Sequence, residues 1–199
     1  MQAPALPLQG PEADVRYMRI ALALARRMLG ATAPNPAVGA VIVDETTGEV
    51  IARGWTEAGG RPHAETQAIA RAGARARGKT MYVTLEPCSH HGKTPPCAEA
   101  VVKAGLARVV VATDDPDSRV SGRGIALLVE AGIDVSLSVC AHEGRWVGLG
   151  HILRVTRRRP TRRPPGPILI ARASCRGRPG SPGERGPRPA PSAFPGEST

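Results

Sequence analysis

One histidine, one glutamate and two cysteines constrain this chain more than any other feature. His63 and Glu65 stand two positions apart, and Cys88 and Cys97 follow with eight residues between them. A catalytic zinc ion takes three protein ligands, commonly imidazole nitrogen and thiolate sulfur, and leaves its fourth position open. We therefore predict that His63, Cys88 and Cys97 bind Zn²⁺. Glu65 is expected to face the ion without binding it and to transfer protons as a general acid and base.

The positions of the two cysteines favour the thiolate form that a metal ligand needs. Cys97 follows Pro96, which suits the first turn of a helix, and Cys88 comes just past an expected strand. The dipole at a helix N-terminus stabilises a thiolate. Taken singly, a histidine near a glutamate is more often a solvated pair, and two cysteines at this spacing are more often unrelated buried residues. The four residues together, each at the end of an expected element, favour the metal site.

Apolar periodicity predicts alternating helices and strands. The stripe from Val15 to Leu29 has helical spacing, short apolar runs have the length of strands, and glycines and prolines separate the segments. The expected helices are 13–29, 64–76, 98–104 and 121–130, and the expected strands are 38–43, 50–54, 81–85, 108–112 and 133–139. This order predicts an α/β sandwich whose sheet is largely parallel and opens with one antiparallel hairpin.

The positive charge of the chain is concentrated in its last part. The whole sequence carries 27 Lys and Arg against 17 Asp and Glu, a net charge of +10. Residues 147–199 hold eleven Arg, no Lys and two Glu, so they carry +9 and all preceding residues together only +1. We therefore predict three regions: an extension over 1–12, the zinc-binding domain over 13–146, and a basic tail over 147–199.

The tail is expected to be disordered from about Arg157 onward. It contains ten Pro and eight Gly and few apolar residues, so it buries too little surface to offset the entropy cost of ordering. A nucleic-acid-binding tail is one interpretation of its charge. The other, which we favour, is a GC-rich gene read out of frame or a truncated further domain, and nucleic acid is then not an expected partner.

Neither a membrane segment nor a secretory signal is evident in the sequence. No apolar run reaches the length of about 18 residues that a spanning helix needs. The first ten residues lack the basic start and apolar centre of a signal peptide. The expectation is a cytoplasmic protein without a membrane partner, in which Cys140 packs as a small apolar side chain and Cys175 has no evident role.

The motifs His63-Ala64-Glu65 and Glu86-Pro87-Cys88, together with Cys97, resemble the cytidine deaminase-like superfamily. The resemblance covers about residues 13–139. It implies a three-layer α/β/α sandwich with a mixed five-stranded sheet. It also implies hydrolytic removal of an amino group from a nucleobase-like ring, with a zinc-activated water as the nucleophile.

The long segment between the cysteines resembles one branch of that superfamily, the pyrimidine deaminases of riboflavin biosynthesis. The motifs Asn35-Pro36-x-Val38-Gly39, Asp115-Pro116 and Val120-x-Gly122-x-Gly124 are similar to the same branch. The resemblance implies the substrate 2,5-diamino-6-(ribosylamino)-4(3H)-pyrimidinone 5′-phosphate, which loses its 2-amino group as ammonia. A reductase domain commonly follows in this family, but the pattern ends here between about 157 and 164, so no reductase activity is expected.

Three residues near the expected zinc site are candidates for substrate contacts. Lys93 is the first candidate for binding the sugar phosphate, and His90 is the second, because both can donate hydrogen bonds to an anion. Asn35 stands between two prolines and offers both a donor and an acceptor to a ring edge. The alternative for each is a solvated loop residue.

Two other functions are open at this point. A nucleic-acid base deaminase of the tRNA type, with the same fold, would use the basic tail to bind RNA. A catalytically inactive module would bind zinc only for stability, and Glu65→Gln separates this case from an enzyme. A homo-oligomer is compatible with the sequence, which does not decide it.

Overall fold

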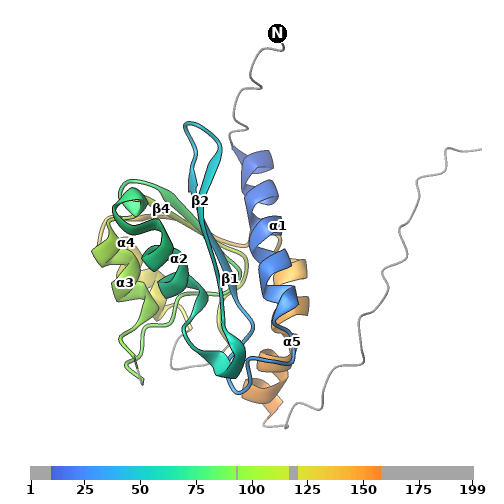
Figure 1. Cartoon of the computed structure of the whole chain (residues 1–199). Helices are drawn as coiled ribbons and strands as arrows, with labels where there is room; N and C mark the ends of the chain where they lie inside the picture. Colours follow the sequence, from blue (N-terminus) through green and yellow to red (C-terminus); the bar gives the residue numbers. More distant parts are fainter. Residues whose placement is uncertain (1–9, 93, 117–120, 158–199) are drawn as a thin grey trace, which may run out of the picture. The chain divides into compact units, whose positions relative to one another are not determined.

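The computed structural model describes residues 10–92, 94–116 and 121–157 (Figure 1). Helices and strands alternate along most of this part of the chain. The α-helices are α1 (Pro11–Arg27), α2 (Ala64–Ala72), α3 (Cys97–Ala104), α4 (Arg123–Glu130) and α5 (Ala141–Arg157), with short 3₁₀ turns at Ala58–Gly60 and Gly73–Ala76. The strands are β1 (Gly39–Asp44), β2 (Glu49–Trp55), β3 (Thr80–Val83), β4 (Arg108–Val111) and β5 (Asp134–Ser136).

The five strands form one mixed sheet in the order β2-β1-β3-β4-β5. Strand β1 is antiparallel to both β2 and β3, while β3, β4 and β5 run parallel. The mixed five-stranded sheet is confirmed. The antiparallel hairpin at the start is present, but the sheet is less parallel than expected, because β1 also pairs antiparallel with β3. Periodicity identifies a strand but contains no information about its neighbour in the sheet.

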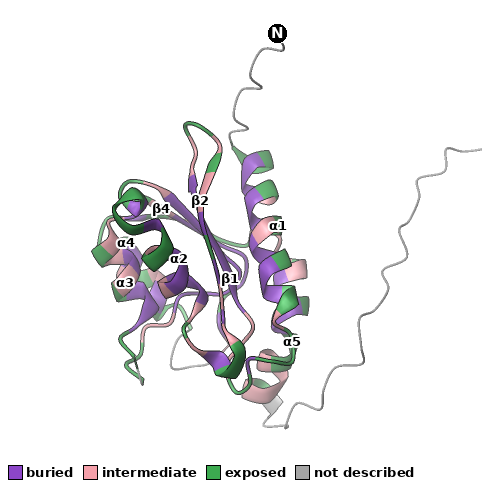
Figure 2. Ribbon diagram, in the orientation of Figure 1, coloured by how far each residue is buried: buried purple, intermediate pink, exposed green. Residues whose placement is uncertain are grey.

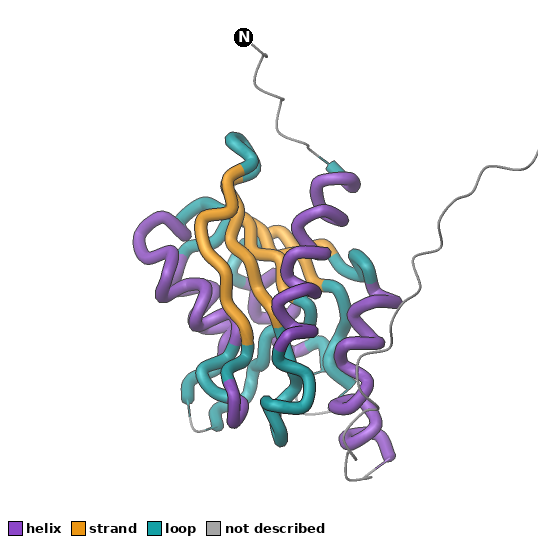
Figure 3. The backbone as a smooth tube through the Cα atoms, turned by 45° about the vertical axis from the view of Figure 1, so that its right-hand side comes forward, coloured by secondary structure: helices purple, strands orange, loops and turns teal. Residues whose placement is uncertain are grey.

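Helices cover both faces of the sheet, which confirms the three-layer sandwich (Figure 3). Alternate residues of each strand point to opposite faces. Ala40 and Ile42 of β1 pack in one apolar cluster with α2, α3 and α4. Val41 and Val43 pack in the other cluster with α1 and with Val147 of α5. All four side chains are fully buried, and Figure 2 colours most of β1 as buried, so both layers stabilise the sheet that carries the site.

A partly buried ionic network fixes α1 to the sheet. The guanidinium of Arg108 in β4 donates two hydrogen bonds to the carboxylate of Asp14 in α1, at 2.9 and 2.8 Å. The hydroxyl of Tyr82 in β3 lies 2.9 Å from the same carboxylate and 2.7 Å from Glu45. Because removal of one partner would leave a buried charge unpaired, this network constrains the position of α1 strongly.

Two helices cross the limits that the sequence predicts between its three regions. Helix α5 (Ala141–Arg157) crosses the predicted boundary between 146 and 147 and belongs to the same compact unit as the sheet. Glycines at 144, 148 and 150 hide its helical pattern, since glycine has low helix propensity. Gly144 is buried against Ala112, the residue that follows β4, so packing rather than propensity explains the helix. At the other end, α1 includes Pro11, within the predicted extension.

Strand β5 is shorter than predicted, and part of the predicted tail lies outside the described residues. The pattern over 133–139 predicts one strand, but pairing with β4 covers only Asp134–Ser136, and Leu137 is exposed. The predicted disorder beyond Arg157 and the expectation for Cys175 concern residues that the structure does not describe. Within the described ranges, no helix combines the length and apolarity that a membrane crossing requires.

We predict that Gly39→Ala destabilises the fold. A Cβ atom at Gly39 would lie 2.0 Å from the Ala21 carbonyl oxygen of α1, so helix and strand must separate. The expected loss is about 1–3 kcal/mol in the free energy of unfolding, measured by urea titration. Gly148→Ala is the matched control, because its nearest neighbour would lie at 3.7 Å and alanine favours the helix. Equal stability of the two variants would contradict the tight α1–β1 contact.

The ion pair between Asp44 and Lys79 predicts a pH-dependent contribution to stability. The Lys79 ammonium, 2.6 Å from the Asp44 carboxylate, lowers the pKa of Asp44 from 3.8 to about 2. The stabilising contribution is therefore complete above pH 3.8 and is lost as the pH falls toward about 2. Urea titrations should show Asp44→Asn less stable than the wild type at pH 6. This difference in the free energy of unfolding should shrink as the pH falls from 3.8 to about 2.

Glu49→Gln is the matched control for this measurement. Glu49 pairs with Arg75 at 2.7 Å, but both side chains are more than half exposed. Solvent screens such a pair, so little change in stability is expected at any pH. A difference between wild type and Asp44→Asn that stays constant from pH 6 to about 2 would contradict the assignment to Asp44.

Candidate metal centre

Three segments from distant parts of the chain supply the side chains of the site. His63 is the residue that caps the N-terminus of α2, and Cys97 is the first residue of α3. Cys88 lies in the loop that follows β3. The expectation that Cys97 begins a helix directly after Pro96 is confirmed. Two helix N-termini therefore face one point, which favours negatively charged groups there.

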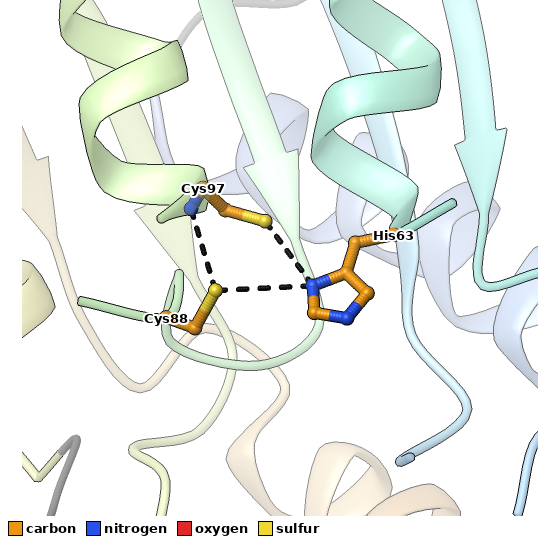
Figure 4. Close-up of side chains that lie close together, drawn as sticks. All are labelled: His63, Cys88 and Cys97. Atoms are coloured by element: carbon orange, nitrogen blue, oxygen red, sulfur yellow. Dashed lines mark hydrogen bonds between the residues drawn. The ribbon is translucent and has the colours of Figure 1, made fainter. Parts of the chain in front are cut away.

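The nitrogen and sulfur atoms of these residues converge as one metal ion requires (Figure 4). His63 Nδ1 lies 3.3 Å from Cys97 Sγ and 3.8 Å from Cys88 Sγ, and all three ligand atoms lie within 4.8 Å of one another. Tetrahedral zinc with ordinary bond lengths separates a nitrogen and a sulfur ligand by about 3.6 Å. The donor set and the spacing thus fit a zinc ion with one open position.

The electrostatics of the site favour a thiolate at Cys88. Hydrogen bonds from the Cys97 side chain and from His63 lower the pKa of Cys88 to about 4, although burial opposes the shift. The backbone N–H of Cys97 also donates to Cys88 Sγ at 3.3 Å. The neighbouring Cys88, together with burial, raises the pKa of Cys97, and the hydrogen bond to Cys88 raises the pKa of His63. A divalent cation would relieve the concentration of negative charge on the two sulfurs.

Glu65 lies in the first turn of α2 and is 4% exposed. Burial raises the pKa of its carboxyl group to about 7, with the charge of Cys88 acting in the same direction and that of His63 opposing. It is not among the three residues whose atoms converge as a metal set. A carboxyl group in this environment can accept and return a proton near neutral pH.

The predicted substrate contacts differ in where the structure places them. The Asn35 side-chain nitrogen donates to the Gly60 carbonyl at 2.7 Å and lies 3.1 Å from His63 Nε2. Asn35 is therefore next to the metal centre, on the side of the imidazole away from the cysteines. His90 is exposed in the loop between the cysteines. Lys93 lies outside the described residues. The roles of all three in substrate binding stay predictions.

Sequence reasoning missed the structural role of Glu86, which appeared only as part of a motif. Its buried carboxylate accepts hydrogen bonds from the backbone N–H groups of Gly122 and Gly124 at 3.1 and 3.0 Å, and longer ones from Asp115 and Ile125. Three of these four amides lie at the start of α4, whose N-cap residue, Gly122, has no side chain that could accept hydrogen bonds. A buried glutamate needs such donors, but no local pattern identifies them.

The sheet, the two helix N-termini and the nitrogen–sulfur cluster beside a buried carboxylate define a zinc-dependent deaminase fold. Comparison with known families agrees with this class. Residues 11–113 match the family described as the cytidine and deoxycytidylate deaminase zinc-binding region. The match covers more than half of the chain, and the chain belongs to this family.

Individual relatives point to one branch of the family. The riboflavin biosynthesis protein RibD of Aquifex aeolicus is 48% identical over 149 residues, which are 75% of this chain and 41% of that protein. The diaminohydroxyphosphoribosylamino-pyrimidine deaminase of Buchnera aphidicola is 43% identical over 142 residues, which are 71% of this chain and 95% of that protein. The solved structure of RibD from Acinetobacter baumannii has a TM-score of 0.70 at 44% identity, covering 73% of this chain and 40% of that one.

These matches concern the deaminase part of the larger relatives. The chain spans about two fifths of the length of the RibD proteins named above, whereas it spans nearly all of the Buchnera deaminase. The resemblance to the pyrimidine deaminases, inferred from sequence motifs, is therefore confirmed over the domain that carries the metal centre.

We predict that Cys88→Ser abolishes stable zinc binding, because a hydroxyl replaces the thiolate that binds the metal. Metal analysis of the purified protein should fall from about one zinc ion per chain to near zero. Chelation should lower the thermal midpoint of the wild type but not that of the variant. Cys140→Ser is the matched control, since Cys140 packs against the apolar cluster beneath α1. Loss of zinc in both variants would contradict the assignment.

Proposed function

We propose that the chain hydrolytically deaminates 2,5-diamino-6-(ribosylamino)-4(3H)-pyrimidinone 5′-phosphate. The products are 5-amino-6-(ribosylamino)uracil 5′-phosphate and ammonia. The observation that carries this proposal is the convergence of His63, Cys88 and Cys97 beside the buried carboxyl group of Glu65. The substrate class is supported by the Buchnera deaminase, almost all of which the chain matches.

His63, Cys88 and Cys97 would hold the zinc ion, with two thiolates and one neutral imidazole offsetting its charge. When bound, zinc supplies a Lewis acid that makes water a nucleophile near neutral pH. The chain's own contribution is to fix the three ligand atoms from α2, α3 and the loop after β3. This leaves one side of the site for substrate.

Glu65 would move the proton that hydrolysis requires. Its carboxylate takes a proton from the attacking water and delivers it to the departing amino nitrogen, which leaves as ammonia. Burial raises the pKa of Glu65 to about 7, so the protonated and ionised forms are close in free energy at neutral pH. The α2 backbone orients Glu65 because it follows His63 by two residues in the first turn.

Asn35 would bind the edge of the pyrimidine ring, and Lys93 and His90 the phosphate. The position of the Asn35 amide, 3.1 Å from His63 Nε2, supports the first assignment. The charge of Lys93 and the hydrogen-bonding capacity of His90 support the second. A small phosphorylated substrate matches a domain whose residues before 147 carry a net charge of only +1.

We predict that Glu65→Gln lowers ammonia release by at least about 100-fold while zinc content is unchanged, because the amide cannot accept and return the proton. The assay measures ammonia from the diaminopyrimidinone phosphate with the zinc-loaded protein. Glu130→Gln, at the exposed end of α4, is the matched control and should retain wild-type activity. A variant at Glu65 with wild-type turnover would overturn its role, and a zinc-loaded wild type that releases no ammonia would favour a non-catalytic module.

A further inference from the structure

A buried histidine joins helix α5 to the loop that follows β4. His151 Nε2 lies 3.0 Å from Asp115 Oδ1, and the two side chains are only 8% and 9% exposed. His151 comes from the part of the chain that the sequence assigned to a tail. Asp115 lies four residues after the end of β4. The contact thus joins segments 36 positions apart.

The hydrogen bonds around His151 define which nitrogen carries the proton. The guanidinium of Arg154 lies 3.2 Å from His151 Nδ1. A guanidinium can only donate hydrogen bonds, so Nδ1 is the accepting nitrogen. In the neutral ring Nε2 then carries the proton and donates it to the Asp115 carboxylate. Arg154 thus donates to His151, and His151 donates to Asp115. Each contact joins one donor to one acceptor, as a buried polar network requires.

The same loop is also bound by Glu86. The backbone N–H of Asp115 donates to the Glu86 carboxylate, and the backbone N–H of Glu86 donates to the Thr113 carbonyl at 2.9 Å. Glu86 is two residues before Cys88. The backbone of residues 112–116, which we call the Asp115 loop, is therefore fixed to the segment that carries Cys88, and the side chain of Asp115 is fixed to α5.

The topology places this loop beside the metal centre. Strands β3 and β4 are parallel neighbours, so the segments that follow them leave the sheet at the same edge. Cys88 is in the segment after β3, and Asp115 is in the segment after β4. Ligands of α/β sheets bind at the carboxyl ends of the strands. The Asp115 loop is thus placed to form a wall of the substrate site.

We propose that His151 is a positioning residue for the deaminase reaction: it holds the Asp115 loop in the place that substrate binding requires. This inference rests on the proposed function. It differs from a purely structural role of the pair, in which His151 would only attach α5 to the rest of the domain. In that case its replacement would change stability but leave the affinity for substrate unaltered.

The test compares His151→Met with His151→Gln in the full chain loaded with zinc. The two side chains have the same length, but only glutamine retains an N–H donor for Asp115. We expect His151→Met to raise KM for the diaminopyrimidinone phosphate by about tenfold, with kcat and zinc content within about twofold of the wild type. His151→Gln should recover most of the wild-type KM.

His142→Met is the control on the same helix, because His142 is exposed and its side chain accepts a hydrogen bond from Trp146 of the same helix, at 3.3 Å. Its KM should equal that of the wild type. Equal KM values for His151→Met and His142→Met would overturn the proposal. So would an increase in KM that His151→Gln does not reverse.

Amide hydrogen exchange provides a readout that does not depend on activity. His151→Met should speed exchange at the N–H groups of Asp115, Gly122 and Gly124, which donate to Glu86, while exchange in β1 stays slow. Unchanged exchange at these three amides would overturn the positioning role.

If His151→Met does not fold, Asp115→Asn weakens the same hydrogen bond and should give the same local increase in the rate of amide exchange. A wild type without ammonia release would refute the proposed function, and the exchange result would still decide this inference.

Discussion

The structure depends on the convergence of one imidazole and two sulfurs at a single point. Two of these groups stand at the N-termini of α2 and α3, and the third follows β3. Such a cluster concentrates negative charge in a partly buried place, and helix dipoles, hydrogen bonds and a divalent cation together compensate it. The sheet and the helices on it bring the ligand atoms of these three segments within 4.8 Å of one another.

Small residues make this convergence sterically feasible. A Cβ atom on Gly54 of β2 would lie 2.0 Å from the carbonyl oxygen of Ala64, which is the neighbour of His63. A Cβ atom on Gly124 of α4 would lie equally close to the carbonyl of Pro87, the neighbour of Cys88. At both positions, the absence of a side chain sets how closely the ligand-bearing backbone approaches its support.

Helix α5 extends the folded domain beyond the boundary that composition suggests. Composition separates residues 147–199 from the rest of the chain, since arginine, proline and glycine dominate there. The helix nevertheless continues through Arg157, and Val147 packs in the apolar cluster with α1. The side chain of His151 is buried against Asp115. A boundary derived from average composition is insensitive to a few well-packed residues, because burial depends on neighbours that are distant in sequence.

The chemistry of the site and the order of most elements follow from residue types and their spacing along the chain. Ligand identity depends on residue type, so His63, Cys88 and Cys97 were recognisable from type and spacing, and the strands β1 to β4 were recognisable from apolar runs. The pairing of β1 with β3, the binding of Glu86 to amides at the start of α4 and the packing of α5 on the sheet domain become visible only in the folded structure. The physical reason is that a local pattern records which groups a segment offers, whereas the partner of each group is set by packing across the sheet.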